Sequence, residues 1–414
     1  MPNTARAAAS SWLPLFIAVC LVAINMRMTI SGVGPLLEEI AADQGVTPAA
    51  LGALASIPLL AWAAVSPLAQ GLAARFGLDR AVSWSLIVLM IATAWRSVPG
   101  TPLNLWLGTA LIGIALAVAN VLMPASIKRD FGSRVPLVMG VYSALISASG
   151  ALGAAIVAPV AHFSPGGSGG GSADALGWRW ALLATGVTLP IALIAWILVT
   201  RRARSATRSA APTPAPASHA GLTRRIWFDR VAWWVAIYMG AQSWIFYTHA
   251  TWLAPIDLSR GADPVAAGLG VTLFHTCGIV GSFIAPFIAR GPMRLSAPML
   301  VPLTSLAAAL GIVFAPAVLP LWLVIGGLSC GLSLSFALTF VAQRASDTAT
   351  AGALSGMSQS FGYLIAGLGP ILFGWLYGLS GSWGVSLIAL LIGIALQLGA
   401  GIALLRERMV FSRF

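Results

Sequence analysis

The sequence predicts an all-α membrane protein with twelve transmembrane helices, arranged as two pseudo-symmetric bundles of six helices each. Of the 414 residues, 58% are hydrophobic and only 8% are charged, so lipid must solvate most of the chain. Apolar windows of about 20 residues recur along its whole length. The two halves of the chain also resemble each other weakly, at a nearly constant offset.

Each apolar window is bounded by charged residues or by clusters of Gly and Pro, and each is long enough to cross the hydrocarbon core of a bilayer. In order, the predicted spans are 12–37, 49–74, 81–98, 103–126, 135–162, 178–200, 231–256, 265–289, 295–316, 318–343, 350–378 and 383–405. The first window is longer than the apolar core of a signal peptide, so we expect it to remain as the first helix.

Basic residues fall almost entirely on one side of this topology. The alternate loops that include both termini carry 19 of the 23 Lys and Arg, whereas the opposite loops carry only Arg96, Arg179 and Arg260. Positive charge stays in the cytoplasm, so we expect both termini to be cytoplasmic. Topology thus accounts for the net charge of +12, and nucleic acid is not an expected partner.

A basic linker rich in Pro and Ala divides the chain. We expect an N-terminal six-helix bundle at 1–200, a cytoplasmic linker at 201–228 and a C-terminal six-helix bundle at 229–414. Gly34-Pro35 aligns with Ala254-Pro255, Ser66-Pro67 with Ala285-Pro286, and Gly140 and Gly153 with Gly356 and Gly369. These offsets of about 216 to 220 indicate a parallel duplication. A second low-complexity stretch, 164–172, reads as a flexible external loop.

Neither a metal site nor a cofactor is expected. Cys20, Cys277 and Cys330 lie in three separate spans without paired spacing and read as packing residues. All eleven acidic residues fall in loops or at span ends, and the spans offer two scattered His. An enzyme needs clustered nucleophiles, bases or metal ligands at membrane depth, so we expect no enzyme.

Arg27 is the main candidate for a functional group. It lies about 21 Å along the helix from Leu13 and about 15 Å from Leu37, near the bilayer midplane. Burying an Arg there costs roughly 2.5 to 3.5 kcal/mol on insertion scales, and no Asp or Glu lies within 12–37. Either Arg27 hydrogen-bonds carbonyls and fixes two helices together, or its planar donors bind an anionic or electron-rich solute.

Four stretches and one loop resemble a known family. The loop 71–80 is similar to the signature loop of the major facilitator superfamily, with Ala74 in place of its acidic residue. The stretches 25–27 with 31–37, 120–129, 136–140 and 354–360 resemble the cyanate permease family of that superfamily, which also contains transporters of 2-nitroimidazole. Met28 and Thr29 depart from the pattern of the cyanate permease, which has Pro and Leu after the Arg.

This resemblance implies the major facilitator fold and a monomeric solute carrier in the bacterial cytoplasmic membrane. The implied function is secondary active or facilitated transport of a small, anionic or electron-rich solute by alternating access. The alternative is efflux of small aromatic or nitro-heterocyclic compounds, with Trp62, Trp244 and Tyr247 stacking on them. A proton is a candidate co-substrate, and membrane lipid is the surrounding solvent.

The repeat alignment places Tyr247 opposite Arg27 on the seventh span, where Ser243 and Thr251 lie one turn away on either side. We expect Tyr247 to donate its hydroxyl to the solute, with simple aromatic packing as the alternative. Further candidates for substrate binding, each with a packing alternative, are Asn120, Tyr142, Gln242, Trp244, Gln359 and Tyr363. For proton coupling the candidates are His249 and His275, because their unperturbed pKa lies near neutral pH.

Overall fold

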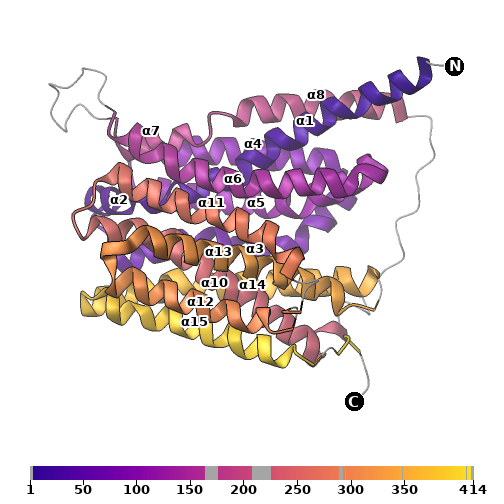
Figure 1. The fold of residues 1–414 in the computed structure, drawn as a ribbon. Helices are drawn as coiled ribbons and strands as arrows, with labels where there is room; N and C mark the ends of the chain where they lie inside the picture. Colours follow the sequence, from indigo (N-terminus) through magenta and orange to yellow (C-terminus); the bar gives the residue numbers. More distant parts are fainter. Residues whose placement is uncertain are drawn as a thin grey trace. The chain divides into compact units, whose positions relative to one another are not determined.

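A computed structural model describes residues 3–163, 176–207, 225–288, 292–293, 295–346, 348–406 and 408–411. Within these ranges every regular element is an α-helix or a short 3-10 helix (Figure 1). The predicted external loop 164–172 and most of the predicted linker 201–228 lie outside the described residues. The chain divides into two compact units, and each is described by itself.

The first unit comprises Met1–Gly32 and Val65–Ala215. Its helices are α1 (Asn3–Ser31), the second half of α3 (Pro48–Phe76), α4 (Leu78–Ser97), α5 (Pro102–Phe131), α6 (Val135–Ala161), α7 (Gly177–Ala184) and α8 (Leu189–Thr207), with the 3-10 turn η2 (Gly132–Arg134). Helix α1 packs against α5, α6 and α8, while α4 packs against α5, α7 and α8. Helix α1 is therefore held on several sides.

The second unit comprises Val33–Ala64 and Pro216–Phe414. Its elements are η1 (Gly34–Leu36), α2 (Leu37–Gln44), the first half of α3, α10 (Arg230–Leu258), α11 (Pro264–Ile288), α12 (Ala297–Phe314), η4 (Pro316–Val318), α13 (Leu319–Gln343), α14 (Thr348–Ser380) and α15 (Trp383–Ala403). Helix α10 contacts η1, α11, α13, α14 and α15. It is thus the central helix of this unit.

Two predicted spans are interrupted where proline removes a backbone donor. The predicted span 12–37 becomes α1, which ends at Ser31, followed by η1 with Pro35 near its start. The predicted span 178–200 becomes α7 and α8, separated by a turn at 185–188. Pro190 explains this break, because its ring would clash with the carbonyl of Gly186 one turn earlier.

The prediction of an all-α membrane protein is confirmed. Among the described residues, eleven helical segments are long and apolar enough to span a membrane, including Gly177–Arg201 across the α7–α8 break. Helix α10, which covers the predicted span 231–256, is not among the eleven, although it has 29 residues. Its buried residues include Gln242, Ser243, Thr248 and His249, which lower its hydropathy. Protein rather than lipid surrounds most of α10.

Candidate functional site

Helix α1 holds Arg27 between buried neighbours in the first unit. Met26 and Met28 are buried, and the Arg27 backbone N–H lies 3.2 Å from the Ser149 hydroxyl of α6. Gly153 of α6 allows this approach, because a Cβ there would lie 2.9 Å from the Met28 Cα. The Arg27 side chain itself is half-buried. Close packing of α1 against α6 therefore fixes the backbone from which Arg27 projects.

A polar contact joins Asn25 of α1 to Thr188, the residue before α8. The Thr188 hydroxyl donates to the Asn25 side-chain oxygen at 2.8 Å, and the Asn25 amide donates to the Leu21 carbonyl at 2.8 Å. Asn25 is completely buried. It is a positioning residue for α1 that the sequence indicated only as part of the motif containing Arg27.

Arg96 is a second buried cation in this unit. The sequence placed it with the external loop charges, but its side chain in the last turn of α4 is 1% exposed. One of its terminal nitrogens donates to the Thr29 carbonyl of α1 at 2.9 Å. A long side chain at a helix end can fold back onto a neighbouring helix, which explains why Arg96 is buried although the sequence counted it with the external charges.

Two other predicted binding residues belong to the same unit. Tyr142 of α6 is buried, with 4% of its surface exposed, and Asn120 of α5 is half-buried. Helix α5 contacts both α1 and α6. Their roles in solute binding stay predictions.

In the second unit, α10 uses several polar side chains for internal contacts. The Gln242 amide donates to the neighbouring Ser243 hydroxyl at 2.6 Å, and the Trp244 indole donates to the Ala389 carbonyl of α15 at 3.0 Å. Both Gln242 and Trp244 are buried. The indole N–H of Trp244 thus ties α10 to α15, and its role in solute binding stays a prediction.

Aromatic side chains from three helices meet beside α10. The Trp62 ring of α3 lies 6.2 Å from the Tyr247 ring and 4.9 Å from the Tyr363 ring of α14, measured between centroids. On the other side, Tyr247 contacts Phe246 at 5.0 Å. The structure therefore brings together two predicted residues, Tyr247 and Tyr363, through Trp62. We call Trp62, Tyr247 and Tyr363 the aromatic cluster.

Gln359, one turn before Tyr363, is half-buried and donates to the Ser355 hydroxyl at 3.0 Å. The sequence named Trp62 only in connection with the alternative function. An apolar helix rich in Ala and Leu offers no periodic polar signal at Trp62. Only the approach of α3 to α10 and α14 shows its place in the cluster.

The two histidines pack against phenylalanine rings next to the aromatic cluster. The His249 ring stacks on Phe274 at 5.5 Å, and its Nδ1 lies 2.8 Å from the Ile245 carbonyl. The His275 ring lies 5.4 Å from Phe246. Both residues are buried, and within the described part of the chain no group of His, Cys, Asp and Glu could hold a metal ion. Proton coupling through these rings stays a prediction.

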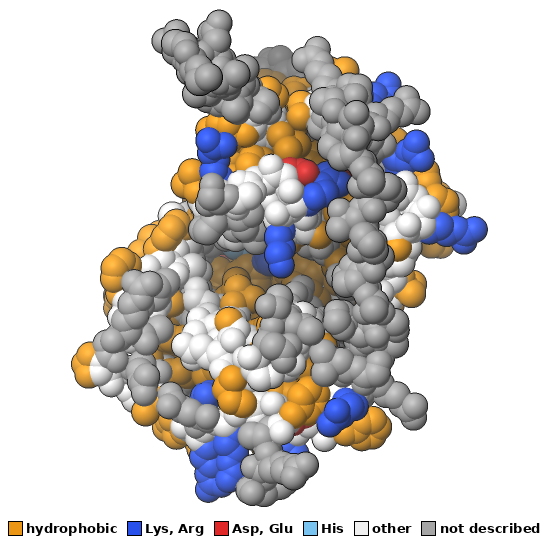
Figure 2. Space-filling model, turned by 90° about the vertical axis from the view of Figure 1, so that its right-hand side faces the viewer, with side chains coloured by type: hydrophobic (Ala, Val, Ile, Leu, Met, Phe, Trp, Pro, Cys, Tyr) orange, Lys and Arg blue, Asp and Glu red, His pale blue; other side chains and the backbone are white. Residues whose placement is uncertain are grey.

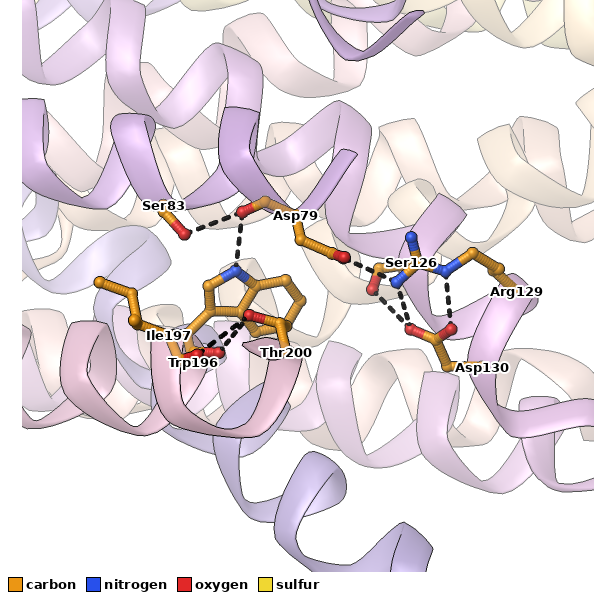
Figure 3. Close-up of polar contacts among 8 residues, drawn as sticks. All are labelled: Asp79, Ser83, Ser126, Arg129, Asp130, Trp196, Ile197 and Thr200. Atoms are coloured by element: carbon orange, nitrogen blue, oxygen red, sulfur yellow. Dashed lines mark hydrogen bonds and ion pairs between the residues drawn. The ribbon is translucent and has the colours of Figure 1, made fainter. Parts of the chain in front are cut away.

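In the first unit, a network of charged side chains links the start of α4 to the end of α5 (Figure 3). Arg129 of α5 forms ion pairs with Asp79 of α4 and with Asp130, both at 2.6 Å. The Asp79 side chain is only 8% exposed, and its backbone carbonyl accepts from the Trp196 indole of α8 at 3.2 Å. Asp79 belongs to the signature-like loop 71–80, so this loop connects α4 to α5 and α8.

Replacing Asp79 by Asn should lower thermal stability slightly. The ion pair to Arg129 is lost, but Arg129 is 45% exposed and keeps Asp130 as a partner, so we expect a loss of about 0.5 to 1 kcal/mol. Thermal melting of purified protein in detergent measures the change. The matched control is Asp130→Asn at a more exposed carboxylate, which should cost less. A larger loss in the control would contradict the assignment.

Comparison with known proteins agrees with this architecture. The sequence profile of the Major Facilitator Superfamily matches residues 15–370. A 2-nitroimidazole transporter of Escherichia coli is 35% identical over 92% of this chain and 93% of its own. The cyanate transport protein CynX of the same organism is 27% identical over 89% of this chain and 91% of its own. The crystal structure of a bacterial homologue of the lysosomal transporter Spinster covers 98% of this chain and 99% of its own, with 16% identity and a TM-score of 0.76.

In the described part of the chain, helices form repeated apolar spans, a basic residue lies within the first apolar span, and aromatic side chains cluster beside α10. These features define a multi-pass membrane transporter. The chain belongs to the Major Facilitator Superfamily. The resemblance to the cyanate permease and 2-nitroimidazole transporter family is confirmed, as is the major facilitator fold.

Proposed function

We propose that this transporter carries a small, anionic or electron-rich solute across the cytoplasmic membrane by alternating access. The observation that carries this proposal is Arg27, a charged side chain within the apolar segment Trp12–Gln44, one turn before the end of α1. Helix α6 holds the backbone of Arg27 in place. A guanidinium offers paired planar donors that match carboxylate-like oxygens. The two relatives named for cyanate and 2-nitroimidazole transport support a small solute with acceptor atoms.

A second candidate function is efflux of small aromatic or nitro-heterocyclic compounds. The aromatic cluster favours it, because rings contribute affinity for other rings through stacking and edge contacts. The 2-nitroimidazole transporter is also the more similar of the two relatives. Either direction of transport would use the same binding groups.

We also propose two rocking halves, 1–200 and 229–414, joined by the linker 201–228, with both termini in the cytoplasm. Supporting this orientation, the exposed basic residues Arg75 and Lys128 lie in the last turns of α3 and α5, the ends that the predicted topology assigns to the cytoplasm. In the view of Figure 2, several Lys and Arg side chains are exposed and very little acidic surface is visible. A monomer, embedded in lipid, is sufficient for this mechanism.

Contacts across the proposed halves support alternating access. Although 33–64 belongs to the N-terminal half of the sequence, these residues pack with the C-terminal helices. A Cβ on Gly52 of α3 would meet the backbone of α14 at Pro370 and Ile371, 3.0 and 3.1 Å away. Transport by rocking requires such a contact to form and separate in each cycle.

Replacing both His249 and His275 by Gln should leave solute counterflow intact. In counterflow, labelled solute exchanges for unlabelled solute, so no net proton movement is needed. If these residues carry the coupled proton, concentrative transport driven by a pH gradient should fall while exchange continues. Loss of counterflow in a folded double variant would show instead that these residues bind solute or hold the helices together.

A ligand screen tests the proposed function directly. Purified protein is heated with cyanate, small carboxylates and 2-nitroimidazole, and the melting temperature is compared with that of the protein alone. A ligand that binds only the folded protein raises its stability in proportion to occupancy. Stabilisation that saturates, followed by counterflow of the same compound in liposomes, would support the proposal. Absence of stabilisation by every member of the panel would refute the proposed solute class.

A further inference from the structure

Trp62 is a buried residue whose indole N–H donates a hydrogen bond to no described residue. Its side chain is 1% exposed, and among the described residues Nε1 has no hydrogen-bond partner. A buried donor without a partner destabilises a fold, because the hydrogen bond that it made to water in the unfolded chain is not replaced.

Other buried tryptophans in this protein behave differently. Trp196, Trp244 and Trp252 donate to the carbonyls of Asp79, Ala389 and Pro370, at 3.2, 3.0 and 3.1 Å. The Trp178 indole N–H also has no hydrogen-bond partner in the part of the chain that the structure describes, but Trp178 lies at the start of α7 with the Arg179 guanidinium 4.3 Å from its ring. Trp62 is in the first half of α3, within the aromatic cluster.

The surroundings of Trp62 suit a flat molecule. The planes of Tyr247 and Tyr363 stand at 75° and 74° to the indole plane. Aromatic pairs at centroid separations of about 4.5 to 7 Å attract each other in edge or offset arrangements. Tyr363 and the next residues of α3, Ala63 and Ala64, are half-buried or exposed, so the cluster lies at the margin of the packed interior.

We propose that the Trp62 indole N–H donates to an acceptor oxygen of a small planar aromatic solute, such as a nitro-heterocycle or an aromatic carboxylate. The rings of Tyr247 and Tyr363 contact the same solute. This inference rests on the proposed function and names its substrate class. Cyanate, a linear ion without a ring face, gains nothing from the tyrosine rings and should bind more weakly.

The test replaces Trp62 by Phe, which keeps a ring and removes the N–H. Without ligand, Trp62→Phe should melt at the wild-type temperature or above it, because no hydrogen bond is lost. Its affinity for 2-nitroimidazole, measured by thermal-shift titration and by counterflow, should be about five- to tenfold weaker, the effect of one lost hydrogen bond. Trp62→Tyr provides a second variant that keeps a polar ring at this position.

Trp252→Phe is the matched control, because its buried indole donates to Pro370. This control should melt at a lower temperature without ligand and bind 2-nitroimidazole with wild-type affinity. The wild type alone gives a further test, since 2-nitroimidazole and benzoate should stabilise it more than cyanate at equal concentration.

Unchanged affinity in Trp62→Phe would overturn the inference. So would a wild-type protein stabilised by cyanate and not by either aromatic compound, an outcome that leaves the proposed function standing. A wild-type protein that responds to no compound of the panel would overturn both.

Discussion

Arg27→Ala should abolish saturable solute binding while leaving the protein folded. Removing a paired set of charge-assisted hydrogen bonds to an anion should weaken binding about 100-fold or more. The fold should survive because α1 is held by contacts that do not involve this side chain, including Asn25 with Thr188 and Gly153 with Met28. Loss of a charge from the middle of a span also lowers the cost of membrane insertion.

The measurement compares ligand-induced stabilisation and counterflow in wild type, Arg27→Ala and Arg27→Lys. Lysine keeps the charge but not the planar pair of donors, so its affinity should fall about tenfold and remain measurable. An equal loss of solute affinity in both variants would indicate that the geometry of the guanidinium, rather than its charge, decides recognition. Unchanged solute binding in Arg27→Ala would contradict the proposal that this residue binds the solute.

The matched control for Arg27 is Arg96, a buried arginine of the first unit that also contacts α1. Arg96 donates to the Thr29 carbonyl and so supports the end of α1. Arg96→Ala should lower the melting temperature more than Arg27→Ala does, and its direct effect on ligand affinity should be smaller. The two variants separate a binding role from a structural one.

Gly52→Ala should slow transport at least tenfold with little change in ligand-induced stabilisation. A methyl group at Gly52 would press on the Pro370 backbone, which cannot rotate away as a side chain can. The contact between α3 and α14 could then not close, and the transport cycle would stop on one side. Solute binding from the open side requires no such closure, so the thermal shift should remain.

Gly71→Ala in the same helix is the matched control, because nothing lies within 4 Å of the added methyl group. Both substitutions raise helix propensity by up to about 1 kcal/mol, so this effect cancels between them. Counterflow in liposomes measures the rate, and the thermal shift measures binding. Wild-type transport by Gly52→Ala would show that closure of this contact is not required.

Long apolar runs made most helices predictable, because a membrane span requires about 20 apolar residues whatever its tertiary contacts. Helix ends were less predictable. The break between α7 and α8 depends on Pro190, whose clash acts one turn earlier in the chain. Helix α8 also extends to Thr207, into the stretch that the sequence assigned to the linker.

Individual side-chain roles were the least predictable. Arg27 could be identified because a charge within an apolar run is costly in any membrane fold. Trp244 and Trp62 look alike in sequence, as large apolar residues within spans. Their roles diverge only where Ala389 accepts the N–H of Trp244 and no described residue accepts that of Trp62.

By itself, then, the sequence determined the all-helical membrane class, the apolar spans and the cation within the first span, because lipid imposes these constraints on each segment separately. The tertiary structure alone decided which helices approach closely enough to share hydrogen bonds. It buried Arg96 against Thr29, joined Asp79 to Arg129 and brought Trp62 to Tyr247 and Tyr363. These contacts depend on residues far apart in the chain, whose pairing no local pattern specifies.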